Sequence, residues 1–325
     1  MRRRDALSGL LIACAAPGAL AQAARTATVG LLIPTPETDP ENPPRLAAFA
    51  AVLEKAGWRR GANLRIEVRH AVGDEQLRAR LRELVALEPA VLLVQSNQAL
   101  AIARDEKVAT PIVFVAVADP VGSGFVANLA RPGGNVTGFA NFGTETGGKW
   151  LQVLRQIAPR TRSVTVLLNP TIAANRQLAS SVETAAGPLG IAVTTAAVTD
   201  NVSLEQALAG LAGKRDWGLV VLPNPTNSQH RKQIIGAAAR HRVPAVYPFS
   251  FFARDGGLVA YGVDVKAVFE SAAGYVDRIL RGARAGELPV QQPTKYELAI
   301  NMATARALGL DVPVAQRALA DEVIE

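Results

Sequence analysis

The chain has almost no cysteine and few aromatic residues. Its 325 residues include one cysteine, Cys14, and only 5% are Phe, Trp or Tyr. A single cysteine excludes a disulfide within the chain and a zinc site built on cysteine pairs. If Cys14 is lost with a leader, the remaining chain has no thiol nucleophile. This usage suits an oxidising compartment.

The chain also lacks a strong charge pattern. Its formal net charge is +7, and no run of five or more like charges occurs. The basic residues are spread along helical segments such as residues 75–83, where a solvated helix face explains them better than a nucleic-acid surface does. We therefore expect no nucleic-acid partner.

Motifs that carry catalysis are missing as well. The sequence has no G-x-S-x-G elbow, no Walker A loop and no H-E-x-x-H pair. His70, His230 and His241 are too scattered for a metal set. Residues 122–127 fit the dinucleotide-binding pattern G-x-G-x-x-A. They follow Asp119 and Pro120 instead of opening a helix directly, so they do not predict a dinucleotide site. We expect no enzyme activity, no cofactor and no metal.

Residues 1–23 have the layout of an export signal peptide. Three arginines precede an apolar run over residues 6–16, and Ala21, Gln22 and Ala23 give an A-x-A cleavage site. The paired arginines resemble a twin-arginine signal, while Sec export remains an alternative. Residues 11–14 also resemble a lipobox, which would anchor the chain at Cys14. The predicted location is the periplasm.

Apolar strands alternate with amphipathic helices along the rest of the chain, in two series. Such strands indicate parallel sheets covered by helices on both faces. The strands of a sheet with one solvent-exposed face would instead alternate apolar and polar residues. In the first series strands are predicted over residues 28–33, 63–70, 91–94, 112–117 and 136–142, with helices after Pro44 and over 74–87 and 96–104. In the second, helices are predicted over 144–158, 175–189, 203–211 and 228–242, with strands over 163–168, 191–197, 218–222 and 244–247.

Residues 256–310 follow these two series and add a strand (258–261), a helix (265–281), a Gly/Pro-marked crossing and a last strand (296–301). A chain that crosses between two lobes three times explains this late unit. The crossings are expected near residues 140–143, 249–257 and 287–292. The prediction is an α/β protein with two doubly wound parallel-sheet lobes and a three-crossing hinge. The first lobe comprises residues 24–140 and 258–288, and the second comprises 141–257 and 289–325.

Several stretches resemble the ABC transporter substrate-binding proteins of the tryptophan-binding-like family, which have the type I periplasmic binding protein fold. They cover nearly the whole chain after the leader and keep the family's order: residues 118–120, 129–138, 238–248, 261–264, 273–280, 292–298 and 320–324. The resemblance implies capture of a small-molecule solute between the lobes and delivery to an ABC permease in the inner membrane. We expect a monomer. One alternative is a periplasmic sensor that reports its ligand to a membrane receptor or kinase. Another is a hydrolase or racemase on the same doubly wound scaffold, although the missing nucleophile argues against it.

Ligands of open parallel sheets sit beyond the carboxyl ends of the strands, where helix N-termini supply free N–H groups. The candidate ligand-binding residues at those ends and at the crossings are Ser96, Asn97, Asp119, Asn141, Phe142, Thr144, Asn169, Pro170, Asn224, Tyr247, Tyr261 and Asp264. Each type also has a structural explanation: helix capping for Ser96, Asn97 and Asp264, turn chemistry for the two Asn-Pro pairs, and packing for the aromatic residues.

Taken as ligand contacts, these residues describe a site for an amino acid. Its carboxylate would meet the helix N-termini, its ammonium Asp119 or Asp264, and its side chain the aromatic rings. A buried carboxylate is costly unless it is paired, so an aspartate in a cleft suggests a cationic group on the solute.

Overall fold

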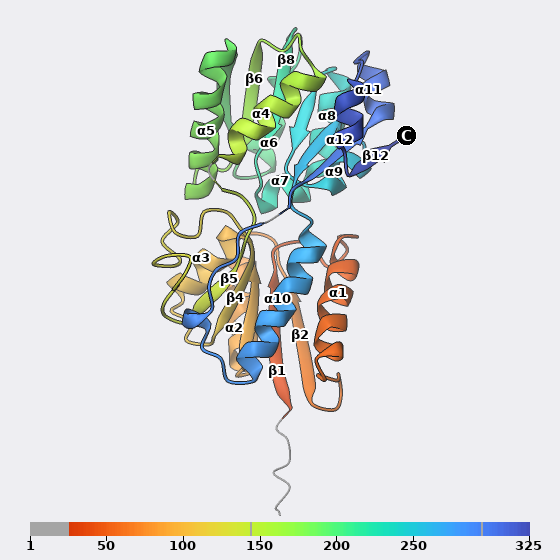
Figure 1. Ribbon diagram of the computed structural model, residues 1–325. Helices are drawn as coiled ribbons and strands as arrows, with labels where there is room; N and C mark the ends of the chain where they lie inside the picture. Colours follow the sequence, from red (N-terminus) through yellow and green to blue (C-terminus); the bar gives the residue numbers. More distant parts are fainter. Residues whose placement is uncertain (1–25, 144, 294) are drawn as a thin grey trace, which may run out of the picture.

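The computed structural model describes residues 26–143, 145–293 and 295–325. The expected signal peptide, the lipobox and Cys14 therefore lie outside the described residues. Two lobes lie end to end, and the chain passes between them at a narrow waist (Figure 1). The prediction of two doubly wound α/β lobes is confirmed.

The first lobe has a five-stranded parallel sheet in the order β2-β1-β3-β4-β5. Central strands β3 and β4 are almost wholly buried, as expected for a sheet with helices on both faces. The elements of this lobe are β1 (Ala27–Ile33), α1 (Asn42–Lys55), β2 (Leu64–His70), α2 (Asp74–Ala86), β3 (Val91–Gln95), α3 (Asn97–Asp105), β4 (Ile112–Val117), β5 (Val136–Ala140), α10 (Val265–Leu280) and the short helix η1 (Ala285–Glu287).

The second lobe has a seven-stranded sheet in the order β12-β11-β10-β9-β8-β6-β7, parallel except where β10 meets β11. Its elements are α4 (Thr146–Ile157), β6 (Ser163–Leu168), α5 (Ala173–Leu189), β7 (Ala192–Ala197), α6 (Asn201–Ala209), β8 (Trp217–Val221), α7 (Pro225–Gln229), α8 (Arg231–Arg240), β9 (Ala245–Tyr247), α9 (Ser250–Arg254), β10 (Val259–Gly262), β11 (Glu297–Asn301), α11 (Met302–Leu308), α12 (Val314–Leu319) and β12 (Glu322–Ile324).

Two helix boundaries differ from the sequence prediction. Helix α1 begins at Asn42 rather than after Pro44, because proline is tolerated in the first turn, where N–H groups have no partner within the helix. The single helix predicted over residues 228–242 is two helices, α7 and α8, that meet at His230. Arg231 is therefore the first residue of α8.

The second crossing was placed too early. Residues 249–257 hold α9, and the next strand, β10, pairs with β9 and β11 in the second lobe instead of joining the first. The sequence does not predict α9 because this helix is only five residues long and shows no helical period. The chain crosses at residues 263–264, so β10 belongs to the second lobe and α10 to the first.

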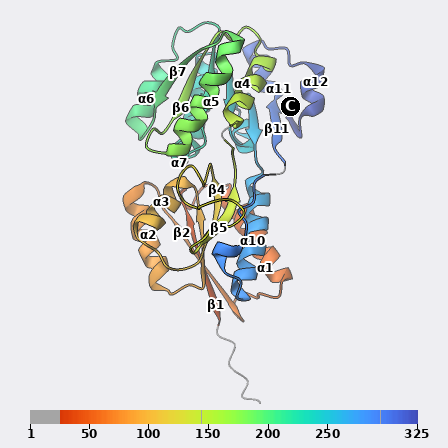
Figure 2. The same cartoon turned by 60° about the vertical axis from the view of Figure 1, so that its left-hand side comes forward.

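Helix α10 then packs along α1 in the first lobe (Figure 2). Trp58 Nε1 donates to Asp277 at 2.7 Å, and Arg281 donates to the Ala56 carbonyl at 2.7 Å. The return crossing also begins later than predicted, since Gln291 still exchanges backbone hydrogen bonds with Gly138 and Ala140 beside β5.

Candidate functional site

A pocket lies between the lobes, at the carboxyl ends of strands from both sheets. Its empty volume is about 630 Å³, part of it open to solvent. The first lobe contributes Pro34, Thr35, Asp39, Arg45, Gln95, Ser96, Asn97, Ala116, Ala118 and Asn141. The first lobe also contributes Val265 of α10. The facing wall consists of Ile172, Pro223, Asn224, Pro225, Ser228, Phe249 and Phe251. One wall is thus mainly polar and the other mainly apolar.

Arg45 is the buried cation of this pocket. Helix α1 presents it on the same face as Phe49 and Leu53, and only 5% of the residue is exposed. Its Nη2 donates to Glu41 at 3.2 Å, and its guanidinium lies over the Phe251 ring at 5.4 Å. Burial lowers the pKa of Arg45, while the charges of Glu41 and Asp39 oppose that shift. Its Nε has no hydrogen-bond partner among the described residues.

Two amide oxygens on the same wall are also unpartnered among the residues that the structure describes: Oε1 of Gln95 and Oδ1 of Asn141. Gln95 ends β3, and Asn141 follows β5 directly, so the sheet of the first lobe fixes both. Buried polar groups are normally hydrogen-bonded. The wall therefore offers one charged donor and two neutral acceptors, a set that fits a group with a carboxylate and an N–H donor.

Asp39 and Arg231 form an ion pair across the interlobe cleft. Nη1 and Nη2 of Arg231 each lie 3.3 Å from a carboxylate oxygen of Asp39, and both side chains are nearly fully buried. Arg231 Nε also donates to Asp255, within the second lobe, at 2.6 Å. Burial alone would lower the pKa of Arg231, but the hydrogen bond to Asp255 and the charge of Asp39 outweigh it and raise that pKa.

Four of the predicted site residues line the pocket: Ser96, Asn97, Asn141 and Asn224. Ser96 caps α3 by accepting from the Ala99 N–H at 3.3 Å. Asn97 donates to the Ala118 carbonyl at 2.7 Å and accepts from the N–H of Ala118 at 2.9 Å. These two side chains hold the pocket wall together.

Asn224 is committed in the same way, because it caps α7 by accepting from the Asn227 N–H at 2.8 Å. Of the four, Asn141 keeps a buried oxygen without a partner among the described residues.

The two predicted aspartates do not line the pocket. Asp119 accepts from the Gly122 N–H at 2.9 Å and closes a turn after β4. Asp264 caps α10, where its Oδ1 accepts from the N–H groups of Lys266 and Ala267 at 2.8 and 3.3 Å. Both carboxylates are used by local backbone groups, and Asp39 is the aspartate that the fold brings to the pocket.

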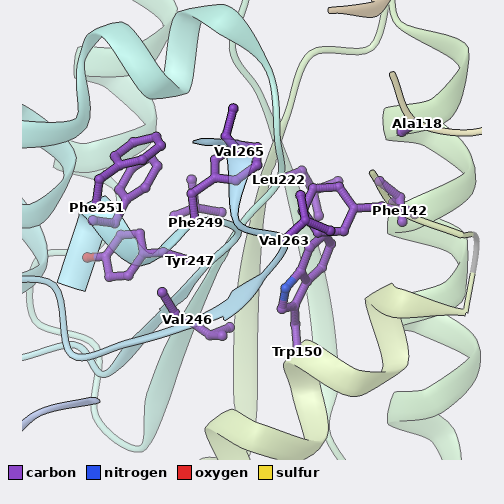
Figure 3. Close-up of a cluster of buried hydrophobic side chains, with 14 of the residues drawn as sticks. Ala118, Phe142, Trp150, Leu222, Val246, Tyr247, Phe249, Phe251, Val263 and Val265 are labelled. Carbon is purple, nitrogen blue, oxygen red and sulfur yellow. The ribbon is translucent and has the colours of Figure 1, made fainter. Parts of the chain in front are cut away.

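The predicted aromatic residues are packed rather than set in the pocket wall. Phe142 lies edge-on to Trp150 at 5.2 Å, and Tyr247 stacks on Phe252 at 5.0 Å, deep in the cluster of Figure 3. Burial raises the pKa of Tyr247. Tyr261 accepts a hydrogen bond from Trp150 Nε1 through its carbonyl oxygen at 2.7 Å.

Two of the three remaining candidates, Asn169 and Pro170, lie apart from the pocket. Asn169 accepts from the Thr171 N–H at 3.0 Å in a local turn and lines a larger neighbouring hollow at the cleft mouth. The carbonyl of Pro170, in the same turn, accepts from Arg176. Thr144 lies outside the described residues.

Sequence reasoning missed Asp39, Arg45, Gln95 and the aromatic pair Phe249 and Phe251. Arg45 carried a readable signal, since a charged residue stands four positions before Phe49 on the inner face of an amphipathic helix. Gln95 is likewise a polar ending to an apolar strand. Asp39 had no comparable signal because its partner lies 192 positions away.

Metal-binding groups and membrane-spanning helices are both absent from the described residues. Across 26–143, 145–293 and 295–325, no group of three or more His, Cys, Asp or Glu side chains could hold a metal ion. No helix in the same ranges is long and apolar enough to span a membrane.

A pocket enclosed by two α/β lobes and three chain crossings defines a solute-binding protein of the type I periplasmic fold. Within that class, the chain belongs to the ABC transporter substrate-binding protein family, whose model matches residues 45–324. Membership implies a small-molecule ligand, an ABC permease as partner and an extracytoplasmic location. The family is one of binding proteins rather than of enzymes.

Relatives agree with this assignment. A tyrosine-binding protein of Clostridioides difficile (strain R20291) is 24% identical over 264 residues, which are 81% of this chain and 75% of the relative. A conserved domain protein of Vibrio cholerae is 26% identical, with a TM-score of 0.85 over 92% of this chain and 100% of that one. An ABC domain from Streptococcus pneumonia in complex with L-Trp has the same TM-score and coverage at 19% identity.

Proposed function

We propose that this protein captures a free amino acid, with an aromatic side chain as the best candidate, and delivers it to an ABC permease. The observation that carries the proposal is a set of three buried polar atoms on one pocket wall that have no hydrogen-bond partner among the described residues: Arg45 Nε, Gln95 Oε1 and Asn141 Oδ1. A zwitterion supplies the missing partners of both kinds. Its carboxylate accepts from Arg45, and its ammonium donates to the amide oxygens.

The opposite wall supports an apolar or aromatic side chain. Phe249 and Phe251 stack on each other at 5.3 Å, and both line the pocket. Val265, the first residue of α10, also lines the pocket and lies beside Phe249 in Figure 3. The names of two relatives, one that binds tyrosine and one solved with L-Trp, support the same class of solute.

We further propose that the chain is exported by the predicted signal of residues 1–23, through the Sec or the twin-arginine route, and works in the periplasm as a monomer. Lipid anchoring at Cys14 is the alternative to a free mature protein. The moving domains in this proposal are residues 26–140 with 264–291, and residues 145–262 with 296–325.

A thermal-shift panel of the twenty amino acids, with solute-free protein prepared by unfolding and refolding, tests the proposed ligand class. We expect stabilisation by L-tryptophan, L-tyrosine or L-phenylalanine and none by tryptamine, which lacks the carboxylate. A panel in which no amino acid raises the melting temperature contradicts the proposal.

A further inference from the structure

We propose that Asp39 and Arg231 form a closure latch, which stabilises the closed arrangement of the lobes whether or not a solute is bound. Arg231 does not line the pocket, whereas Asp39 does. Arg231 is therefore a positioning residue that acts on solute retention through closure. The latch concerns the regulation of the same pocket and rests on the proposed function only where solute affinity is concerned.

The ion pair between Asp39 and Arg231 exists only when the lobes meet. Asp39 follows β1 in the first lobe, and Arg231 begins α8 in the second. Their side chains are 6% and 7% exposed. Separating the lobes returns both charges to water. If Asp39 or Arg231 is replaced, the remaining charge loses a counter-ion in the closed form, where it is buried, but not in the open form. The replacement therefore shifts the equilibrium between closed and open lobes toward the open form.

An aromatic ring lies beside the ion pair. The guanidinium of Arg231 lies over Phe251 at 5.3 Å, and that of Arg45, from the first lobe, lies over the same ring at 5.4 Å. A desolvated cation over an aromatic face is attracted more strongly than an exposed one. Phe251 thus contacts both Arg231 of the latch and Arg45, which we propose to bind the solute carboxylate.

Contacts within the second lobe hold the Arg231 side chain in position for the ion pair. Its Nε donates to Asp255 at 2.6 Å, and its Nη1 donates to the Ser228 carbonyl at 3.2 Å, both within the second lobe. Because these bonds do not cross the cleft, they orient the guanidinium before the lobes meet. A pre-oriented group loses less side-chain entropy when the contact forms.

The interlobe distance measures closure directly. Spin labels at Glu75→Cys and Val202→Cys, in a Cys14→Ser background, place one exposed label on α2 and one on α6, on opposite sides of the cleft mouth. Pulsed electron–electron double resonance on solute-free protein then gives the closed fraction. We expect Asp39→Asn and Arg231→Gln to lower that fraction about tenfold and Arg231→Lys to lower it less.

Asp255→Asn is the matched control. It is the same chemical change as Asp39→Asn and removes a hydrogen bond to the same arginine, but one within a single lobe. We expect it to retain more than half of the closed fraction. Circular dichroism and thermal melts show that each variant is folded.

Equal distance distributions for wild type, Asp39→Asn and Arg231→Gln overturn the latch. Equal losses in Asp39→Asn and Asp255→Asn also overturn it, since the cross-lobe contact would then have no special effect. Titration with L-tryptophan and L-tyrosine separates the two proposals. If neither binds while the solute-free closed fraction still depends on Arg231, the latch stands and the amino-acid assignment fails.

Discussion

Arg45 is a buried arginine whose guanidinium meets a carboxylate, an aromatic ring and the pocket. Glu41 lies at 3.2 Å from its Nη2 and offsets part of the charge, yet Nε remains without a partner among the described residues. Keeping such a group buried is unfavourable unless a ligand completes its hydrogen bonds. We interpret this local destabilisation as the source of binding energy for a carboxylate.

Replacing Arg45 tests that interpretation. Arg45→Gln removes the charge and the fork of donors, so the affinity for L-tryptophan or L-tyrosine should fall about 10- to 100-fold, the range for a hydrogen bond to a charged group. Isothermal titration calorimetry measures the change, and Arg80→Gln on the exposed face of α2 is the matched control. Unchanged affinity in Arg45→Gln would show that the carboxylate binds elsewhere.

We expect the half-buried His70 to make the stability of the fold depend on pH. Asn42 Nδ2 donates to its Nδ1 at 3.4 Å and also to the Pro36 carbonyl at 2.9 Å. Burial lowers the pKa of His70 from 6.5, against the opposing effects of Thr35, Glu37 and Asp39. The neutral ring is therefore favoured in the folded state.

Protonation of His70 then opposes folding. Because the folded pKa lies below the unfolded one, its contribution to stability is fully present above about pH 6.5 and is lost as the pH falls through the folded pKa. We expect the melting temperature to drop less between pH 7.5 and pH 5 in His70→Gln than in wild type. His241→Gln, in the turn after α8, is the control. Identical pH profiles for wild type and His70→Gln would contradict this assignment.

At the scale of elements, strand β10 and helix α10 show how one segment serves two lobes. Gly262 ends β10 just before the crossing, and a Cβ there would lie 1.7 Å from the Pro248 carbonyl oxygen. Gly274 lies within α10, and a Cβ there would meet nothing within 4 Å. The same glycine-to-alanine change should therefore have opposite effects at the two positions.

Denaturant unfolding measures that contrast. Gly262→Ala forces backbone to move and should lower the free energy of unfolding by about 2 kcal/mol or more. Gly274→Ala should raise it by about 0.5–1 kcal/mol, because alanine has the higher helix propensity. A neutral Gly262→Ala would mean that the close approach of β10 to Pro248 does not exist in solution.

The elements themselves were largely predictable from the sequence, because continuous apolar runs of strand length and the period of amphipathic helices are both visible in it. Strand β3 and helix α2 are examples. Helix α9 was not predictable, since five residues hold too little period, and the second crossing was misplaced with it. Strand β12, only three residues long, was missed for the same reason.

The site was less predictable than the fold. Strand ends led to Ser96, Asn97, Asn141 and Asn224, and these four residues line the pocket because topology alone places them there. Whether a side chain is free for a ligand depends on partners that are distant in sequence or on backbone geometry. Asp264 and Asp119 are used locally, while Asp39 meets an arginine of the other lobe.

At the scale of the whole molecule, the two lobes contribute different chemistry to one pocket. The first lobe provides the pocket atoms that have no hydrogen-bond partner within the described ranges, and the second provides most of the apolar surface and the arginine of the proposed latch. A solute can therefore dock on the first lobe and be covered by the second. Only contacts that differ between open and closed forms shift that equilibrium, and Phe251 and Arg231 provide such contacts.

Native mass spectrometry tests the central claim most directly, namely that one amino acid binds in the pocket through Arg45. Solute-free wild-type protein and Arg45→Gln are each incubated with an equimolar mixture of the twenty amino acids and sprayed under non-denaturing conditions. The account predicts a 1:1 adduct with the mass of a single amino acid on the wild type, and its loss in Arg45→Gln. Wild-type protein that carries no amino-acid adduct, or an adduct equally abundant in both proteins, would contradict it.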